Sequence, residues 1–81
     1  MPKNMSEKLL TFELASKDEI EIHLDQEGIQ ELIQILTKLQ KSNKPNHNHL
    51  MTSAWGGNEL TSEKQAAANE LINKVTIRLW G

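Results

Sequence analysis

The sequence predicts one small α+β domain with the order β-β-α-β-β, in which about four short strands form a sheet and one amphipathic helix covers one face of it. Two neighbouring segments near the start, and one near the end, alternate apolar and polar residues, as half-buried strands do. Between them, apolar residues recur at intervals of three and four, which indicates a helix. A chain of 81 residues has room for one hydrophobic core. We therefore expect a single domain over residues 1–81, with 1–7 as a loose N-terminal segment.

The first two predicted strands form an antiparallel hairpin. They span residues 9–14 and 19–24, and residues 15–18 have the composition of a turn. In the first strand, Thr11 and Glu13 are expected on the solvent side. The side chains expected to face the core are Leu10, Phe12, Leu14, Ile20, Ile22 and Leu24.

The predicted helix begins directly after the second strand. Asp25 suits its N-cap, because a carboxylate can accept hydrogen bonds from the free N–H groups of a first helical turn. An apolar stripe then runs to about Lys41 with helical spacing. The helix ends before Pro45, which cannot continue the hydrogen-bond ladder. The members of the stripe are Ile29, Leu32, Ile33, Leu36 and Leu39.

The second half of the sequence predicts two more strands, at residues 47–52 and 74–80, with a long polar excursion over 53–70 between them. Ser62 and Gln65 have the spacing of a capping box, so a short helix is expected over 66–68. If the second and third strands are neighbours, they run parallel through a right-handed crossover; otherwise the sheet is antiparallel. A polar loop this long is typical of a functional segment or of a hidden helix.

Composition excludes several classes of function. The 9 Lys and Arg residues are scattered and outnumbered by 11 Asp and Glu residues, so no nucleic-acid partner is expected. No cysteine is present, and Met1–Met5 lack the layout of a secretory signal, which fits a cytoplasmic protein. No segment has the roughly 20 apolar residues of a membrane span. We expect no membrane association.

Catalytic and metal-binding patterns are weak. His47 and His49 project from the same face of a strand and could hold a metal together with His23, but a site needs a third fixed ligand. Neither Ser53 nor Ser62 lies in a nucleophile elbow. The sequence therefore predicts that the protein is not an enzyme and binds no cofactor or metal. A metal site formed by the three histidines remains the alternative.

Residues 55–60 read Trp-Gly-Gly-Asn-Glu-Leu and form the most informative stretch of the polar excursion. A tryptophan beside two flexible glycines can either pack over a small core or be displayed as a binding anchor. Trp80 raises the same question, because it is out of phase with the apolar residues of the last strand. Both interpretations of Trp55 stay open from the sequence.

The run from His47 to Leu60, with His-x-His-Leu-Met-Thr followed by Trp-Gly-Gly-x-Glu-Leu, resembles the immunity protein 32 family of bacterial polymorphic toxin systems. The resemblance extends from about Glu19 to Trp80. It implies a small α+β protein that binds a cognate secreted toxin and blocks it stoichiometrically. It implies no catalytic residue.

Three hypotheses follow. The first is an immunity protein whose partner-binding residues are His47, His49, Trp55, Gly56, Gly57, Asn58, Glu59 and Glu63. In this hypothesis a mildly acidic surface steers a basic toxin domain. The second is a metal-binding protein or metal-dependent enzyme that uses His47 and His49. The third is a structural homodimer formed by pairing of edge strands.

Overall fold

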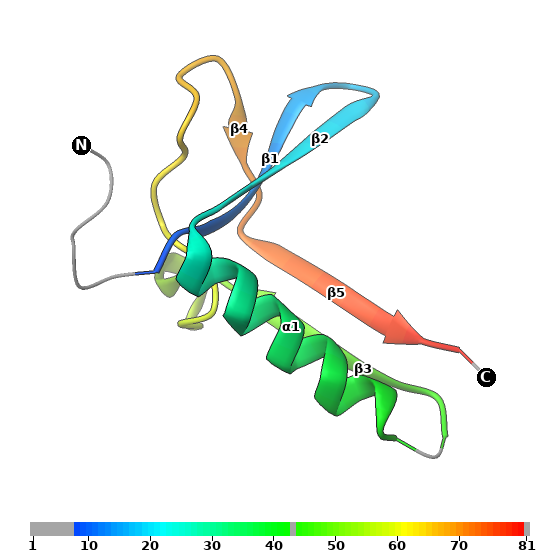
Figure 1. Ribbon diagram of the computed structural model, residues 1–81. Coiled ribbons are helices and arrows are strands. Elements are labelled where there is room, and N and C mark those ends of the chain that lie inside the picture. The colour runs from blue at the N-terminus through cyan, green and yellow to red at the C-terminus, as the bar shows by residue number, and fades with distance from the viewer. Residues whose placement is uncertain (1–7, 43, 81) are drawn as a thin grey trace.

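The computed structural model describes residues 8–42 and 44–80, and the expectation for residues 1–7 lies outside them. The chain is an α+β protein, as its sequence predicts (Figure 1). Its elements, in chain order, are β1 (Leu10–Ser16), β2 (Glu19–Leu24), α1 (Gln26–Gln40), β3 (Asn46–Met51), a 3₁₀ turn η1 (Ser53–Trp55), β4 (Glu70–Leu71) and β5 (Lys74–Leu79).

The strands divide between two sheets instead of forming one sheet of about four strands. One sheet has the order β2-β1-β4, and the other pairs β3 with β5. The short strand β4 pairs with β1, so β5 is left to pair with β3. All these pairs are antiparallel, so of the two arrangements left open by the sequence the antiparallel one is found.

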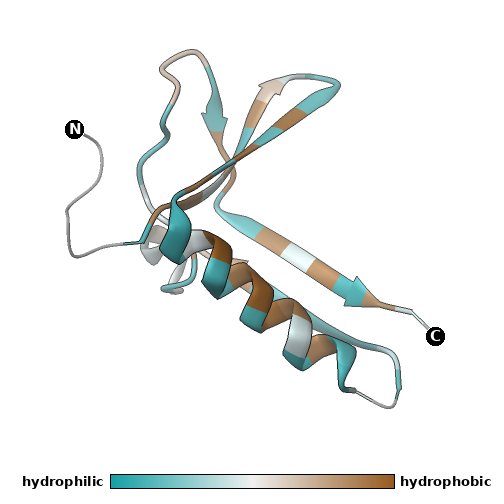
Figure 2. Cartoon of the chain, viewed as in Figure 1, coloured by the Kyte–Doolittle hydropathy of each residue, from teal (hydrophilic) through white to brown (hydrophobic). Residues whose placement is uncertain are grey.

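Helix α1 begins and ends close to where the sequence predicts. Asp25 is its N-cap, and its Oδ1 atom accepts hydrogen bonds from the N–H of Gly28 at 2.8 Å and of Leu9 at 3.1 Å. The same carboxylate therefore fixes the helix start and the chain that enters β1. Figure 2 shows hydrophobic residues recurring along α1 among hydrophilic ones. Of the predicted stripe, Leu39 is buried and Leu32 is half-buried, whereas Ile29, Ile33 and Leu36 are exposed.

The hydrophobic core is small. Within the described part of the chain its buried cluster comprises Leu10 of β1, Leu50 of β3 and Leu60 of the following loop. Partly buried side chains pack around this cluster: Phe12, Leu24, Leu32, Ile35, Val75 and Ile77. The core therefore lies where the start of β1, the end of β3 and the loop after η1 meet.

The β1–β2 hairpin buries the face that was expected to be solvated. Thr11 and Glu13 are completely buried, whereas Ile20 is 58% exposed and Ile22 is 47% exposed. The predicted period is correct, and Leu10, Phe12 and Leu24 lie in or against the core as expected. The predictions that Thr11 and Glu13 are solvated and that Ile20 and Ile22 are buried were wrong. The reason is the segment 62–69, which packs over the polar side of the hairpin and hydrogen-bonds to it.

Glu13 holds that segment in place. Its carboxylate accepts hydrogen bonds from the Thr11 hydroxyl at 2.6 Å, the Gln65 N–H at 2.8 Å and the Asn69 amide at 2.9 Å, with a longer one from the Ala66 N–H. Burial raises the pKa of Glu13, but these donors outweigh it and lower the pKa to about 2.

The short helix expected over 66–68 is absent. The Gln65 N–H, which a capping box would direct to Ser62, is instead donated to Glu13, and Ser62 bonds to Ser53. Residues 62–69 form bends and turns. A buried anion contributed by a distant strand thus takes the role that local capping was expected to play.

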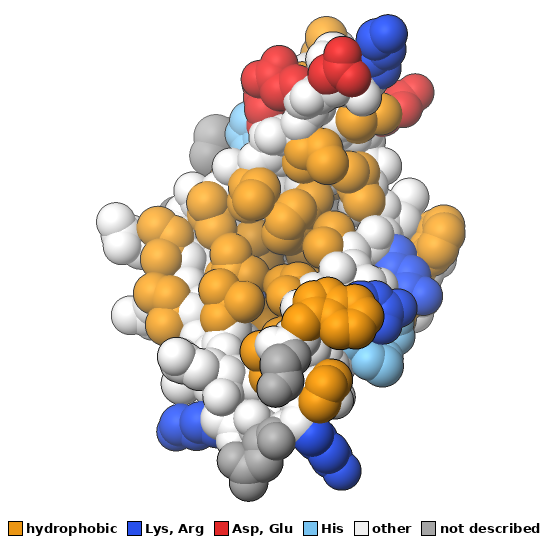
Figure 3. Space-filling view, turned by 90° about the vertical axis from the view of Figure 1, so that its right-hand side faces the viewer, with side chains coloured by type: hydrophobic (Ala, Val, Ile, Leu, Met, Phe, Trp, Pro, Cys, Tyr) orange, Lys and Arg blue, Asp and Glu red, His pale blue; other side chains and the backbone are white. Residues whose placement is uncertain are grey.

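The opposite side of the hairpin is continuous with exposed apolar residues of α1. Figure 3 shows hydrophobic side chains gathered over the hairpin, the helix and the last strand. We define the apolar face by its exposed members: Ile20, Ile22, Ile29, Ile33 and Leu36, which are between 39% and 58% exposed. Most of the aliphatic surface that the two strongest sequence patterns predict to be buried is therefore open.

Candidate partner-binding site

The segment 52–63, which we call the Trp55 loop, is a tightly bonded turn. The N–H groups of Trp55 and Gly57 donate to the Thr52 carbonyl, and that of Gly56 donates to Ser53, each at 3.0 Å. Thr52 is fully buried, and its hydroxyl donates to the Asn73 side chain at 2.7 Å. These bonds fix the loop to the end of β3 and to the start of β5.

Gly56, Gly57 and Glu59 of the motif each have a structural role in the loop. Gly56 has φ of 90°, in the left-handed region that favours glycine. A Cβ atom on Gly57 would lie 2.5 Å from the Met51 carbonyl oxygen, so the two backbones approach too closely for a side chain. The Glu59 carboxylate accepts hydrogen bonds from the N–H of Met51 at 3.1 Å and of Asn58 at 3.4 Å.

Leu60, the last residue of the motif, belongs to the core and is only 4% exposed. It is joined to the end of β3 by a bridge with Thr52. The next residue, Thr61, donates its N–H to Leu10 at 2.8 Å and accepts a hydrogen bond from the Leu10 N–H at 2.9 Å. Residues 56–61 therefore hold the loop rigid against β1 and β3.

Trp55 is the large apolar side chain of the motif that does not pack into the core. It ends η1 and is 57% exposed, although it is the largest side chain in the loop. Burial of a tryptophan contributes strongly to the stability of small proteins and of their complexes. The sequence left open whether Trp55 packs over the core or is displayed on the surface, and in the structure it is displayed. An exposed tryptophan on a rigid turn is typical of a binding anchor.

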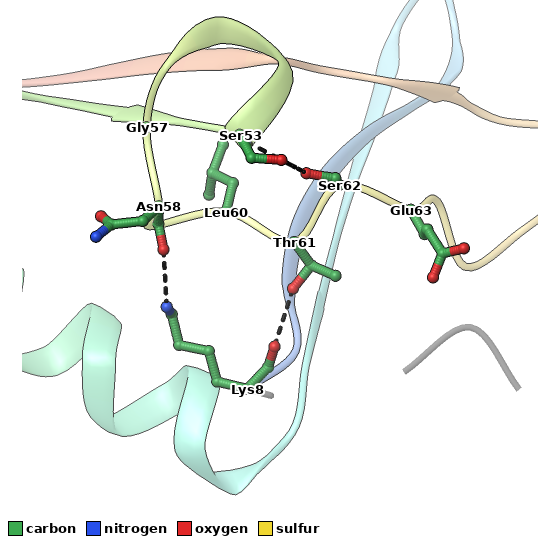
Figure 4. A pocket seen from close by; sticks show the side chains of 8 residues that line it. All are labelled: Lys8, Ser53, Gly57, Asn58, Leu60, Thr61, Ser62 and Glu63. Carbon is green, nitrogen blue, oxygen red and sulfur yellow. Dashed lines mark hydrogen bonds between the residues drawn. The ribbon is translucent and has the colours of Figure 1, made fainter. Parts of the chain in front are cut away.

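A hollow of about 550 Å³ lies beside the loop (Figure 4). Lys8 forms one wall, and its ammonium group donates to the Asn58 carbonyl at 3.1 Å. The hydroxyls of Ser53 and Ser62 bond to each other at 2.8 Å on the opposite side. The remaining lining residues are Gly57, Leu60, Thr61 and Glu63. The hollow presents amide, hydroxyl and ammonium groups, which suits recognition of a polar surface.

The acidic character of this site is modest. Glu63 is exposed and stands at the far end of the hollow from Asn58 in Figure 4. The Glu59 carboxylate is half-buried: burial raises its pKa, but backbone N–H groups and the Lys8 charge lower it below its ordinary value. The acidic residues of the first half of the chain belong mostly to the hairpin and α1. Glu63 is thus the predicted acidic residue that is free to meet a partner here.

His47 and His49 are not part of the loop. They lie side by side in β3, with ring centroids 4.8 Å apart, opposite Arg78 and Thr76 of β5. The His49 Nδ1 atom is 3.0 Å from the Thr76 hydroxyl. Partial desolvation, and then the positive charges of Lys74, His47 and Arg78, lower the pKa of His49. His47 borders a smaller hollow of about 200 Å³ that also contains Trp80.

His23 is held elsewhere. Its Nε2 atom lies 2.9 Å from the Glu21 carboxylate and 3.7 Å from that of Glu13. Over residues 8–42 and 44–80, no three His, Cys, Asp or Glu side chains are grouped so that they could hold a metal ion. No helix in this part of the chain is both long and apolar enough to span a membrane.

Sequence reasoning found the loop but missed what surrounds it. Lys8 and Thr61, which build the hollow, lie in segments without a recognisable pattern. The anchoring role of Glu13 was also missed, since alternation placed it in solvent. The available signal was the length of the polar excursion, because a long ordered loop needs partners for its backbone N–H groups.

Comparison with protein-family models, with curated proteins and with solved structures gives no match to this chain.

Proposed function

We propose that this chain is a toxin-neutralising immunity protein of the bacterial cytoplasm, which binds its cognate toxin domain through the Trp55 loop and blocks it stoichiometrically. The observation that carries the proposal is the 57% exposure of Trp55 on a turn fixed at both ends. Tryptophan in a pre-ordered setting is the residue type most enriched among interface hot spots. Little conformational entropy is lost when such a residue binds.

The resemblance of residues 47–60 to the immunity protein 32 family supports the same function. The structure divides the motif between two roles. Gly56, Gly57, Glu59 and Leu60 shape and anchor the loop. Trp55 and Asn58 remain exposed beside the hollow, with Glu63 at its far end. We assign contact with the toxin to these three residues and to the rim of the hollow.

The site carries one exposed acidic side chain, Glu63, beside groups that can donate and accept hydrogen bonds, which suits a polar partner surface. Glu63 is exposed, and the Asn58 side chain and the serine hydroxyls add acceptors. A toxin domain that acts on nucleic acid carries a basic active site, which such acceptors can cover. Lys8 limits the negative charge, because it lies against Asn58.

The proposal requires that a gene beside that of this chain encode a large secreted protein with a variable C-terminal domain, and the test uses that domain as the candidate toxin. A gene neighbourhood without such a protein would contradict the proposal. Purified chain should bind that domain with one toxin domain per chain and should abolish its activity at equimolar amounts. Activity that persists at a tenfold excess of the folded chain would contradict the proposal. Protection without binding would also contradict it, because stoichiometric blocking requires a complex.

A metal-binding role for His47 and His49 has less support. Their rings are close, but His49 is engaged with Thr76, and the described residues offer no third ligand beside them. A ligand that binds only the folded protein raises the midpoint temperature of thermal unfolding. Zinc added to chelator-treated protein should leave the midpoint unchanged, and a rise that His47→Ala removes would restore the metal hypothesis.

A further inference from the structure

The apolar face and the Trp55 loop are separate surfaces. In Figure 1 the loop after β3 lies to the left of the molecule, near the start of α1, whereas the hairpin tip and the free sides of α1 and β5 face right. Figure 3 views that right-hand side, and its centre is occupied by hydrophobic side chains. The proposed toxin contact therefore leaves the apolar face uncovered.

This face is as large as the largest apolar patches found on monomers, which often bind a partner. Five large aliphatic residues from two elements are each between 39% and 58% exposed. Together they expose on the order of 500 Å², near the upper end of what monomers show, and half-buried neighbours bring the patch closer to the about 800 Å² per partner of a standard interface. On the hairpin, Leu10, Phe12 and Leu24 reach the core within one copy, whereas Ile20 and Ile22 are left uncovered.

The occupant of such a face should be one that the folded protein can meet at all times. An amphipathic helix derives most of its stability from packing of its apolar stripe. In α1, the exposed members Ile29, Ile33 and Leu36 alternate with the partly buried Leu32 and Ile35. A toxin meets the chain only intermittently. A second copy of the chain is always available.

The charges at the two ends of the face are self-complementary. The hairpin tip carries exposed Asp18 and Glu19, with Lys17 beside them. The residues that end and follow α1 carry exposed Lys41 and Lys44, and the sequence has no Asp or Glu between positions 31 and 59. Figure 3 shows acidic side chains gathered at the upper end of the face and basic ones at the lower end.

We infer that the apolar face is a homodimer interface, in which two copies pack face to face about a two-fold axis, with the hairpin tip of each copy over the end of α1 of the other. A two-fold interface uses the same patch on both subunits, so an acidic end and a basic end on one patch meet twice. Burial of the aliphatic residues supplies the affinity, and the charged ends fix the antiparallel orientation. The inference does not depend on the toxin.

The first test is the mass in solution of the full chain, measured by sedimentation equilibrium between about 1 and 100 µM. A dimer is expected, with an unfolding midpoint that rises with protein concentration. A monomer over this whole range would overturn the inference.

The second test locates the interface. Ile33→Asp and Ile20→Asp, which change the helix and the hairpin separately, should each raise the dimer dissociation constant at least about tenfold. Both residues are exposed within one copy, so circular dichroism of the diluted variants should stay native-like. Gln34→Asp is the matched control, because it adds the same charge to an exposed position elsewhere on α1 and should leave the dimer intact. A dimer unaffected by both aliphatic changes would place the interface elsewhere, for instance at edge strands, and would overturn the inference.

The third test fixes the orientation. Asp18→Lys with Glu19→Lys, and separately Lys41→Glu with Lys44→Glu, should each weaken the dimer by about fivefold at low salt, because like charges then meet. All four changes in one chain restore opposite charges and the original net charge. That variant should dimerise within about twofold of the parent. Additive weakening in the fourfold variant would overturn the antiparallel arrangement.

Discussion

Glu13 shows how one residue can define the arrangement of this fold. It is completely buried, and its carboxylate oxygens are bonded to a neighbouring side chain, two backbone N–H groups and a side-chain amide. A buried carboxylate is costly unless it is satisfied in this way. Because three of its donors belong to residues 65–69, Glu13 ties the long polar excursion to β1.

Replacing Glu13 with Gln should destabilise the protein by about 2–3 kcal/mol at pH 7, since an amide cannot accept from all of these donors. The side-chain NH₂ group of the new glutamine would also face backbone N–H groups, and two donors cannot form a hydrogen bond with each other. Chemical denaturation followed by circular dichroism measures the loss. An unchanged free energy of unfolding would show that the Glu13 contacts are not stabilising.

The contribution of Glu13 should also depend on pH. Its pKa is lowered from 4.5 to about 2 in the folded protein, so the stabilisation is complete above about pH 4.5 and is lost as the pH falls towards 2. The pKa values of Glu21 and Glu59 are lowered too, so the parent alone does not isolate one group. The difference in unfolding free energy between parent and Glu13→Gln should shrink from pH 5 to pH 2. A difference that is constant over this range would refute the assignment.

Gly57 should be more sensitive to substitution than its neighbour. In Gly57→Ala the new Cβ would collide with the Met51 backbone, and we expect a loss of about 1–3 kcal/mol in unfolding free energy. Gly56 has open space around it and needs only its positive φ, so Gly56→Asn should cost less than about 1 kcal/mol. Thermal unfolding of the two variants gives the comparison. The reverse order would contradict the packing described for the loop.

At the scale of elements, the junction between β2 and α1 depends on Asp25. Its carboxylate serves both the first turn of α1 and the entry of β1, so Asp25→Ala should cost about 1–2 kcal/mol, more than the loss of a simple N-cap. Gln26→Ala, at the neighbouring exposed position, is the matched control and should change stability little. Equal effects of the two variants would show that the hydrogen bonds accepted by Asp25 do not stabilise the protein.

The elements that local patterns describe could be predicted from the sequence. The hairpin, α1 with its Asp25 cap and the last strand are all present. What alternation cannot say is which side of a strand becomes covered. That depends on the packing of residues 62–69, which are about 50 positions away from Glu13 in the chain. The division into two sheets has the same origin, because β4 is two residues long and carries no local pattern.

At the scale of the whole molecule, the structure presents two surfaces of different character. The Trp55 loop is polar, rigid and anchored to the core, and the apolar face is broad and aliphatic. The loop was recognisable from its Trp-Gly-Gly sequence, although most of that motif supports the loop itself. The apolar face could not be foreseen, since the sequence shows amphipathic elements but not that their apolar sides are left open.

The measurement that tests the proposed function most directly is calorimetric titration of the candidate toxin domain into the parent chain, Trp55→Ala and Trp80→Ala. Both tryptophans are exposed, so each variant should keep its native circular dichroism. Trp55→Ala should weaken binding by at least about 2 kcal/mol, roughly thirtyfold, while Trp80→Ala stays within about twofold of the parent. If the folded Trp55→Ala variant binds the toxin as tightly as the parent, the Trp55 loop is not the binding site.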